Sequence, residues 1–334
     1  MRDINRAKHA LAALIALCTA PLLAAPQAAT LVNPLLPSGP DPWIIQHDGL
    51  FYYMATRGDR LAIRATRDLA RLAEAPERVV WRPSPGTANG RSIWAPELHR
   101  IGNRWYIYYT AAHSDHDDDA HRGVFVLEGT GADPLTARWV DRGRINTARA
   151  GIDGTVFTVR GKRYFAYSPY VGPDSVIAIA RMANPWTLVG NEAIIARPDQ
   201  PWERQGGRQI LEGPAFLAGP RGDLFLAYSG SACWSDDYAL GLLSAPRGSD
   251  PLKPASWTKA PRPVLAKSPA TQVWAPGHNG FFTAGGKSWI VYHANNTAQA
   301  GCAAKRAPHL GQITWARDGK PVFSPPTAGR VPGP

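Results

Sequence analysis

GNRWYIYY at residues 102–109 is one of five related phrases that decide the fold of this 334-residue chain. Each phrase begins at a turn glycine or an Asp-Gly pair and continues into an aromatic-rich run that ends near a tyrosine. The other copies are DGLFYYM from Asp48, GKRYFAYS from Gly161, GDLFLAYS from Gly222 and GKSWIVYH from Gly286. The last four glycines are separated by 59, 61 and 64 residues, which is enough for one four-stranded sheet per repeat. This period predicts an all-β fold, a five-bladed β-propeller.

A second regularity lies upstream of the phrases. Each is preceded by a short segment with a polar, titratable or aromatic centre: GPDPW around Asp41, IWAPEL around Glu97, GIDGT around Asp153, LEGPAF around Glu212 and PGHNG around His278. Because the innermost strand of every propeller blade lines the axis, these segments would aim their side chains into one central cavity. Three carboxylates in one cavity are suited to general acid and base chemistry.

The N-terminal residues have the composition of a targeting segment. Three basic residues among the first eight precede an apolar run from Ala10 to Ala25. The pattern predicts a secretory signal peptide over residues 1–29, with an uncleaved anchor as the alternative, followed by a single propeller domain over 30–334. No later stretch of sequence is long and apolar enough to cross a membrane. We therefore expect a secreted or periplasmic protein.

Export would leave Cys233 and Cys302 in an oxidising compartment. They follow the tyrosines of adjacent blade phrases by five residues (after Tyr228) and ten residues (after Tyr292). We expect a disulfide between these two loops, with two free buried thiols as the alternative. The ring must also close, so residues 31–40 are expected to pair with the last blade, while residues 325–334 are expected to form a frayed tail.

The chain carries a formal net charge of +11, or +9 without residues 1–29. Such a charge would suit nucleic acid, but the basic residues are scattered and form no Lys/Arg-rich helix or stripe. We expect no nucleic-acid and no membrane partner, and a monomer. Attraction to an acidic polysaccharide matrix is a weaker hypothesis. The stretch HSDHDDD from His113 could bind a metal, although a solvated acidic loop is the favoured interpretation.

In this order and spacing, GPDPW, IWAPEL, GIDGT, LEGPAF and GHNGFF resemble glycoside hydrolase family 43. The resemblance covers roughly residues 31–325. It implies a five-bladed propeller that hydrolyses glycosides with inversion at the anomeric carbon and needs no organic cofactor. In that reaction one carboxyl group protonates the leaving oxygen while another deprotonates a water on the opposite face of the sugar.

By this resemblance Asp41 matches the general base and Glu212 the general acid. Asp153 matches the family's third carboxylate, whose charge would keep Glu212 protonated and help to orient it. Taken alone, Asp41 and Asp153 would be interpreted as turn residues before Pro42 and Gly154, and Glu212 as a surface glutamate. Their combination in phase with the repeat favours the catalytic interpretation.

Three further residues are candidates for contacts with a ligand. Trp94 and Trp43 could stack on a sugar ring, with plain core packing as the alternative. His278 matches a family histidine that lies on the axis and helps to hold a water-coordinated calcium ion or another small ion, and a hydrogen-bonded core histidine is the alternative. Because calcium prefers oxygen ligands, one histidine alone does not make a calcium site.

The substrate is the least constrained prediction. Several family branches carry a substrate-contacting arginine shortly before the final Gln-aromatic strand, but the run here is PHLGQITW, with Lys305, Arg306 or His309 as possible replacements. This departure weakens a β-xylosidase assignment. The opening NPLLPSGPDPW and the HANN run that leads to Cys302 are more similar to exo-acting α-L-arabinofuranosidases. We expect arabinan, arabinoxylan or arabino-oligosaccharides as substrates, with an endo-arabinanase, a β-xylosidase or a non-catalytic glycan-binding propeller as alternatives.

Overall fold

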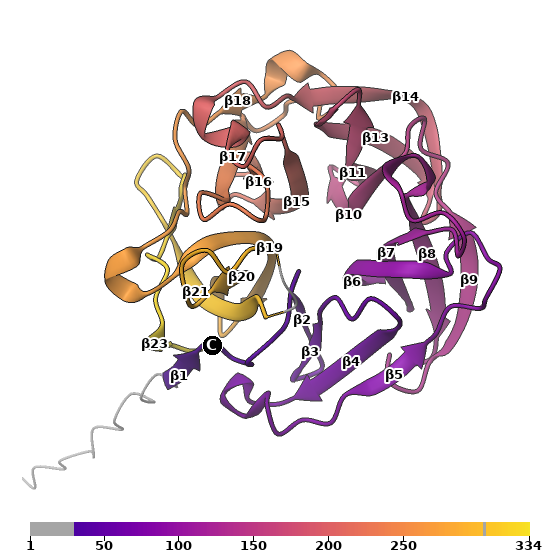
Figure 1. The fold of residues 1–334 in the computed structure, drawn as a ribbon, viewed down its shortest axis with the longest axis horizontal. Coiled ribbons are helices and arrows are strands. Elements are labelled where there is room, and N and C mark those ends of the chain that lie inside the picture. The colour runs from indigo at the N-terminus through magenta and orange to yellow at the C-terminus, as the bar shows by residue number, and fades with distance from the viewer. Residues whose placement is uncertain (1–29, 303–304) are drawn as a thin grey trace, which may run out of the picture.

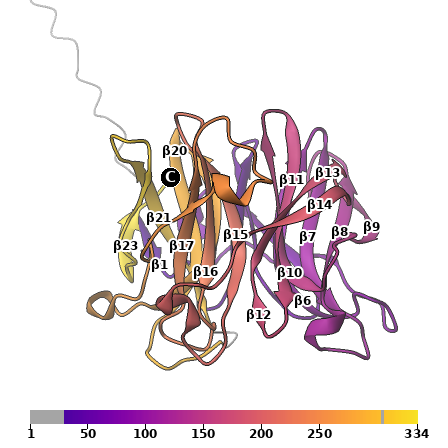
Figure 2. The ribbon, with the colours of Figure 1, turned by 90° about the horizontal axis from the view of Figure 1, so that it is seen from above.

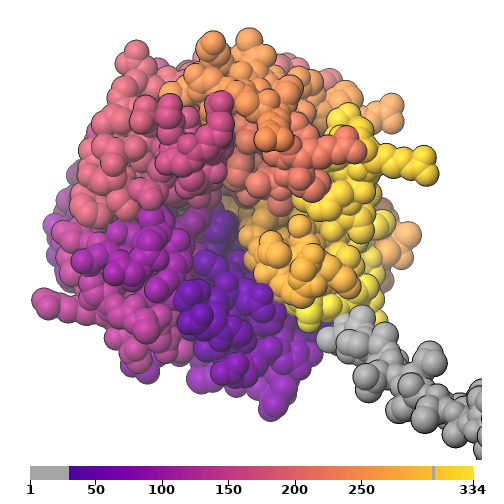
Figure 3. All heavy atoms as spheres, turned by 180° about the vertical axis from the view of Figure 1, so that it is seen from behind, coloured from indigo at the N-terminus to yellow at the C-terminus, as the bar shows by residue number. Residues whose placement is uncertain are grey.

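The computed structural model describes residues 30–302 and 305–334, so the predicted signal peptide lies outside the described residues. The described strands form six antiparallel sheets, of which the five larger ones surround a central axis (Figure 1). Seen from above, the strands run roughly along this axis (Figure 2). The view from behind shows successive parts of the chain following one another around the same centre (Figure 3). The prediction of a five-bladed propeller is confirmed.

Each blade is a meander of four strands, and the first strands of neighbouring blades contact each other around the axis. Blades 1 and 2 contain β2 (Trp43–His47), β3 (Leu50–Met54), β4 (Leu61–Thr66), β5 (Arg78–Trp81), β6 (Arg91–Ile101), β7 (Arg104–Ala112), β8 (Gly123–Thr130) and β9 (Arg138–Arg144). Blade 3 contains β10 (Gly151–Val159), β11 (Lys162–Val171), β13 (Ile177–Asn184) and β14 (Thr187–Ala196), with β12 (Asp174–Ser175) paired to β11.

Blades 4 and 5 follow the same plan. They contain β15 (Leu211–Ala218), β16 (Leu224–Gly230), β17 (Ala239–Ala245), β18 (Thr258–Lys259), β19 (Trp274–Ala284), β20 (Lys287–Asn295), β21 (Ala307–Trp315) and β22 (Pro321–Phe323). The described helices are short 3-10 turns in the connections: η1 (Leu69–Arg71), η2 (Asp119–His121), η3 (Pro201–Arg204), η4 (Pro254–Ser256) and η5 (Pro269–Thr271).

The repeated phrase is the hairpin between the first and second strands of each blade. Gly102, Gly161, Gly222 and Gly286 occupy its turns with φ values of 61°, 73°, 87° and 70°, a left-handed conformation that favours glycine. The aromatic residues three and six positions after these glycines are all buried: Trp105, Tyr108, Tyr164, Tyr167, Phe225, Tyr228, Trp289 and Tyr292. Turn geometry and burial together explain why the phrase recurs.

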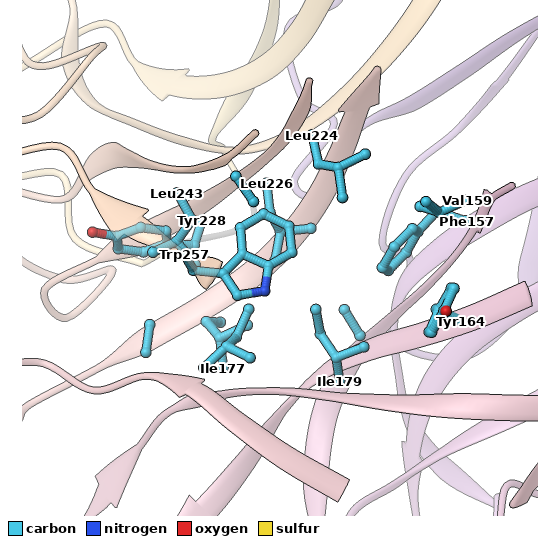
Figure 4. Packing of buried hydrophobic residues seen from close by; sticks show 14 of the residues in the cluster. Phe157, Val159, Tyr164, Ile177, Ile179, Leu224, Leu226, Tyr228, Leu243 and Trp257 are labelled. Atoms are coloured by element: carbon cyan, nitrogen blue, oxygen red, sulfur yellow. The ribbon is translucent and has the colours of Figure 1, made fainter. Parts of the chain in front are cut away.

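The hydrophobic core consists of five layers, one between each pair of neighbouring blades. Figure 4 shows the layer between blades 3 and 4, where Phe157 and Ile179 face Leu226 and Trp257. Because removal of apolar surface from water is the main favourable term in folding, every blade depends on both neighbours for its stability. The layers fix the positions of the inner strands and therefore of the axis.

The ring closes where the two ends of the described chain meet. Strand β1 (Thr30–Asn33) pairs antiparallel with β23 (Gly329–Pro332), and the backbone N–H of Gly39 donates to the carbonyl of Arg306 at 2.9 Å. The expected contact between the chain start and the last blade is confirmed. The prediction of a frayed tail over residues 325–334 is wrong, because β1 supplies a pairing partner that the sequence alone does not reveal.

Candidate active site

A cavity of about 550 Å³ lies at the axis, and all five inner strands or their approaches contribute to its wall. Four of the predicted segment centres line it: Asp41, Asp153, Glu212 and His278. In the IWAPEL segment Trp94 lines the cavity, whereas the predicted centre Glu97 does not. This volume falls within the range of small-molecule sites. The five-fold regularity of the sequence therefore converges on one cavity.

Irregularities in the inner strands aim these side chains at the axis. The pairing of β10, β15 and β19 with their second strands shifts register around Asp153, Gly213 and His278, whose φ values are 58°, 56° and 45°. Asp41 adopts φ 54° just before β2. Bulges re-aim side chains in this way. Left-handed backbone at non-glycine residues is strained and gathers at functional sites.

Asp41 is buried among groups that favour its ionised form. Thr56 Oγ1 donates to Oδ2 at 2.6 Å, and Arg306 Nη1 donates to Oδ1 at 3.1 Å. His293 Nδ1 and His278 Nδ1 lie 3.3 and 3.4 Å from Oδ1. Burial alone would raise the pKa of Asp41, but Arg306, His278 and His293 together outweigh it and hold the pKa well below its ordinary value.

Asp153 and Glu212 form the opposite environment. The backbone N–H of Gly213 donates to Asp153 Oδ2 at 2.9 Å, and Tyr238 Oη donates to Glu212 Oε1 at 2.6 Å. Burial raises the pKa of both carboxyl groups, that of Asp153 to about 7, where the charges of Glu212 and Asp41 add to the effect. The hydrogen bond from Tyr238 opposes this rise at Glu212 only in part. The pair therefore holds a proton near neutral pH.

His278 lies between these two environments. Its Nδ1 is 3.9 Å from Asp153 Oδ2, and its backbone N–H donates to Ser229 Oγ at 2.7 Å. Burial opposes protonation of the ring, but Asp41, Asp153 and Glu212 outweigh it and raise the pKa of His278. A protonated imidazole is a counter-ion for the carboxylates.

The donor atoms around His278 do not fit a directly bound calcium ion. The side chains of Asp153, Glu212 and His278 each place one ligand-type atom within 4.8 Å of the others, but calcium takes six to eight oxygen ligands. The Nδ1 of His278 also faces carboxylates, which favour its protonated form. That His278 helps to hold a calcium ion through water stays a prediction.

The two predicted aromatic platforms have different positions. Trp94 lines the cavity, and the guanidinium carbon of Arg122 lies 4.5 Å from the centroid of its ring. Trp43 is not among the residues that line the cavity. Its indole N–H donates to the carbonyl of Leu98 at 2.8 Å, and its ring packs 4.9 Å from that of His99. The structure thus places Trp43 in the packing between blades 1 and 2, which corresponds to the alternative of core packing.

The acidic HSDHDDD stretch joins β7 to η2 and borders the cavity. Asp119 lines the wall, where it pairs with Arg208 at 2.6 Å and with Arg122. His116 and His121 are exposed, and their rings stack with centroids 4.5 Å apart. The exposed histidines agree with the solvated-loop interpretation, while Asp119 has a structural role that the sequence did not indicate.

Three polar residues of the site were missed or only partly anticipated. Arg306 was one of three candidates for the replaced family arginine, and the structure selects it through its contact with Asp41. His293 ends the fifth repeated phrase, so its position near Asp41 could have been found from the repeat. Tyr238 follows the fourth phrase in a loop of ordinary composition, and no sequence signal points to its bond with Glu212.

The predicted disulfide between Cys233 and Cys302 is present and also borders the cavity. It joins the β16–β17 connection to the segment before β21, and its cysteines are 69 positions apart in the sequence. The double variant Cys233→Ser/Cys302→Ser is expected to lose about 2–5 kcal/mol of unfolding free energy, because the unfolded chain is no longer constrained. Chemical denaturation with and without reductant measures this loss. An unchanged unfolding curve on reduction would contradict the expectation.

The fold and the site together define a β-propeller enzyme with an axial carboxylate centre. Residues 31–321 match the family model described as glycosyl hydrolases family 43. The chain therefore belongs to glycoside hydrolase family 43. Among the described residues, no helix is long and apolar enough to span a membrane.

Individual relatives agree with this assignment. The chain is 40% identical to an extracellular exo-α-(1→5)-L-arabinofuranosidase of Streptomyces avermitilis, over 90% of this chain and 65% of that protein. It is 38% identical to a protein of the same name from Streptomyces chartreusis, over 81% of this chain and 84% of that protein. The crystal structure of an α-L-arabinofuranosidase from Lactobacillus brevis superposes with a TM-score of 0.84 at 32% identity, covering 89% of this chain and 97% of that one. The chain thus spans about two thirds of the first relative's length and most of the other two.

Proposed function

We propose that this protein is an exo-acting α-L-arabinofuranosidase that releases L-arabinofuranose with inversion from arabinan, arabinoxylan or arabino-oligosaccharides. One arrangement carries the proposal: Asp41, Asp153 and Glu212 converge on one cavity. There the neighbouring Arg306 lowers the pKa of Asp41, while burial raises the pKa values of Asp153 and Glu212. Carboxyl groups whose pKa values differ in this way are suited to act as base and acid at the same pH. The names of the relatives support the choice of sugar.

Asp41 acts in this proposal as the general base. Its lowered pKa keeps it ionised across the neutral range, and Arg306 and Thr56 hold its two oxygens in place. It removes a proton from a water whose oxygen attacks the anomeric carbon. The bond from that carbon to the leaving oxygen breaks as the new bond forms, so the configuration inverts.

Glu212 acts as the general acid and gives its proton to the leaving oxygen. Tyr238 occupies Oε1 as a hydrogen-bond donor, so the transferable proton resides on Oε2. The pKa of Asp153 is also raised, and its carboxyl group influences how readily Glu212 gives up its proton. Asp153 also orients the backbone beside Glu212, because it accepts a hydrogen bond from the N–H of Gly213. Activity should therefore decline above neutral pH, as the pair loses its proton.

The cellular setting follows from the relatives and from the N-terminal sequence. Two relatives are named extracellular, and residues 1–29 have the composition of a signal peptide. We infer that the protein is exported to the cell exterior or the periplasm and acts there as a monomer on carbohydrate.

The experiment that tests the proposal compares p-nitrophenyl α-L-arabinofuranoside, p-nitrophenyl β-D-xyloside and linear arabinan as substrates of the mature protein. Cleavage of the arabinoside with release of single arabinose units from arabinan is the expected result. Cleavage of the xyloside alone would replace the sugar assignment with a β-xylosidase. Internal cleavage of arabinan without arabinoside hydrolysis would indicate an endo-arabinanase. Binding to arabinan without any hydrolysis would indicate a glycan-binding propeller.

A further inference from the structure

Trp234 is unusual among the aromatic residues that the structure describes. Large hydrophobic side chains of the described chain that are exposed consist of five valines and this single tryptophan, which is 49% exposed. Trp234 also lines the axial cavity, whereas Asp41 and Asp153 in the same cavity are 8% and 7% exposed. In the free protein the apolar surface of this indole is partly exposed to water. A ligand that stacks on the ring would bury that surface, which favours binding.

The indole is held in position before any ligand arrives. Its Nε1–H donates to the carbonyl of Gly206 at 2.8 Å. The preceding residue, Cys233, is tied to Cys302 by the disulfide. Because these restraints already limit the side chain, little conformational entropy remains to be lost when a ligand stacks on its face.

Charged groups of the same cavity wall complement the indole. Arg208 donates to Asp119 at 2.6 Å, and both side chains are more than one third exposed. Arg122 lies beside them over Trp94. A ligand that presents an apolar C–H face to an indole and hydroxyl groups to guanidinium and carboxylate groups is a neutral sugar ring.

We propose that Trp234 forms a second sugar subsite, which takes the ring on the leaving-group side of the scissile bond. This inference rests on the proposed function, because the buried carboxylates then mark the position of the ring that is released. The ring that leaves extends from these carboxylates towards the exposed part of the wall, where Trp234 stacks on it. The subsite makes the enzyme prefer oligosaccharides to arabinosides with a small leaving group.

The test compares kcat/KM for α-1,5-arabinotriose with kcat/KM for methyl α-L-arabinofuranoside, whose leaving group has no ring. The Trp234→Ala substitution is expected to lower the ratio of the two values about tenfold, which corresponds to the stacking energy of an aromatic ring. Trp234→Phe keeps an aromatic face and should recover most of the ratio. Aryl glycosides are avoided because their leaving group would itself stack on the indole.

Two neighbouring glycines provide a matched control. Gly206 and Gly207 both have left-handed backbone, with φ 83° and 80°. A Cβ at Gly206 would lie 2.8 Å from Ala232 Cβ and 3.1 Å from Trp234 Nε1, whereas a Cβ at Gly207 would meet nothing within 4 Å. The Gly206→Ala substitution should therefore displace the indole and lower the ratio, while Gly207→Ala carries the same backbone strain and should keep it.

The outcomes separate this inference from the proposed function. A wild-type protein that cleaves both arabinosides, together with a Trp234→Ala variant whose ratio is unchanged, would overturn the second subsite alone. Equal losses of kcat/KM on both substrates in Trp234→Ala would also overturn it. The indole would then contact the ring that is released or stabilise the fold. A wild-type protein that cleaves neither substrate would overturn the proposed function and the subsite with it.

Discussion

The Asp41→Asn and Glu212→Gln substitutions are each expected to lower kcat/KM for α-1,5-arabinotriose by roughly 10²–10⁴-fold, the range of a lost general base or acid. Both substitutions keep the size of the side chain but remove its ability to exchange a proton. The two variants should differ in their kcat/KM for p-nitrophenyl α-L-arabinofuranoside. Its leaving group departs with little protonation, so Glu212→Gln should lose much less on it, whereas Asp41→Asn should lose equally on both substrates.

Glu97 is the matched control for these variants. It is a buried carboxylate on the inner strand β6, but it bonds to His99 at 2.7 Å and is not among the residues that line the cavity. Glu97→Gln is expected to keep kcat/KM within a few-fold of the wild type. An Asp41→Asn variant with substantial activity, or a Glu212→Gln variant with the same loss on both substrates, would contradict the assigned roles.

The Arg306→Ala substitution is expected to lower kcat/KM by roughly 10²-fold at pH 5 and less at pH 7, because a buried charge loses a hydrogen-bonded partner. The base must be ionised, so activity is lost as the pH falls through the pKa of Asp41. In the wild type, burial raises the pKa of Asp41, and the charge of Arg306 is the strongest of the effects that lower it. Without it the pKa rises, and the acid limb of the pH profile moves to higher pH.

Two variants separate this electrostatic role from other losses. Arg306→Lys retains the positive charge and should show a smaller shift of the acid limb. Lys305→Ala removes an exposed neighbouring cation and should leave the limb in place. A uniform loss in Arg306→Ala across the pH range would mean that Arg306 contacts the sugar and does not set the pKa of Asp41.

The parts of the fold and site that could be predicted are those encoded locally and repeated. The turn glycine and the buried aromatics of one hairpin specify a blade, and five copies specify the ring. Asp153 and His278 lie at register shifts of β10 and β19, each eight residues before the turn glycine, so the repeat spacing points to both.

The parts that escaped prediction depend on contacts between blades or between chain ends. Tyr238 reaches Glu212 because Gly277 of the next blade leaves room for its ring, where an added Cβ would lie 2.1 Å from Tyr238 Cε1. Strand β23 near the C-terminus forms only because β1 provides a neighbouring strand with which it can pair. Trp43 belongs to the same GPDPW segment as the cavity residue Asp41, so its sequence position also suggests the cavity. In the structure its indole points towards blade 2, where it contacts Leu98 and His99. Such outcomes are set by tertiary packing, which a single sequence does not display.

In the proposed mechanism Asp41 and Glu212 act on opposite faces of an arabinofuranosyl unit. The most direct measurement follows wild-type digestion of α-1,5-arabinotriose by proton NMR at early times, before the released sugar equilibrates. We predict that β-L-arabinofuranose appears first, because water attacks the face opposite the leaving group. Arabinobiose is the expected co-product, so the released single sugar decides the test: first appearance of its α-anomer would contradict the account.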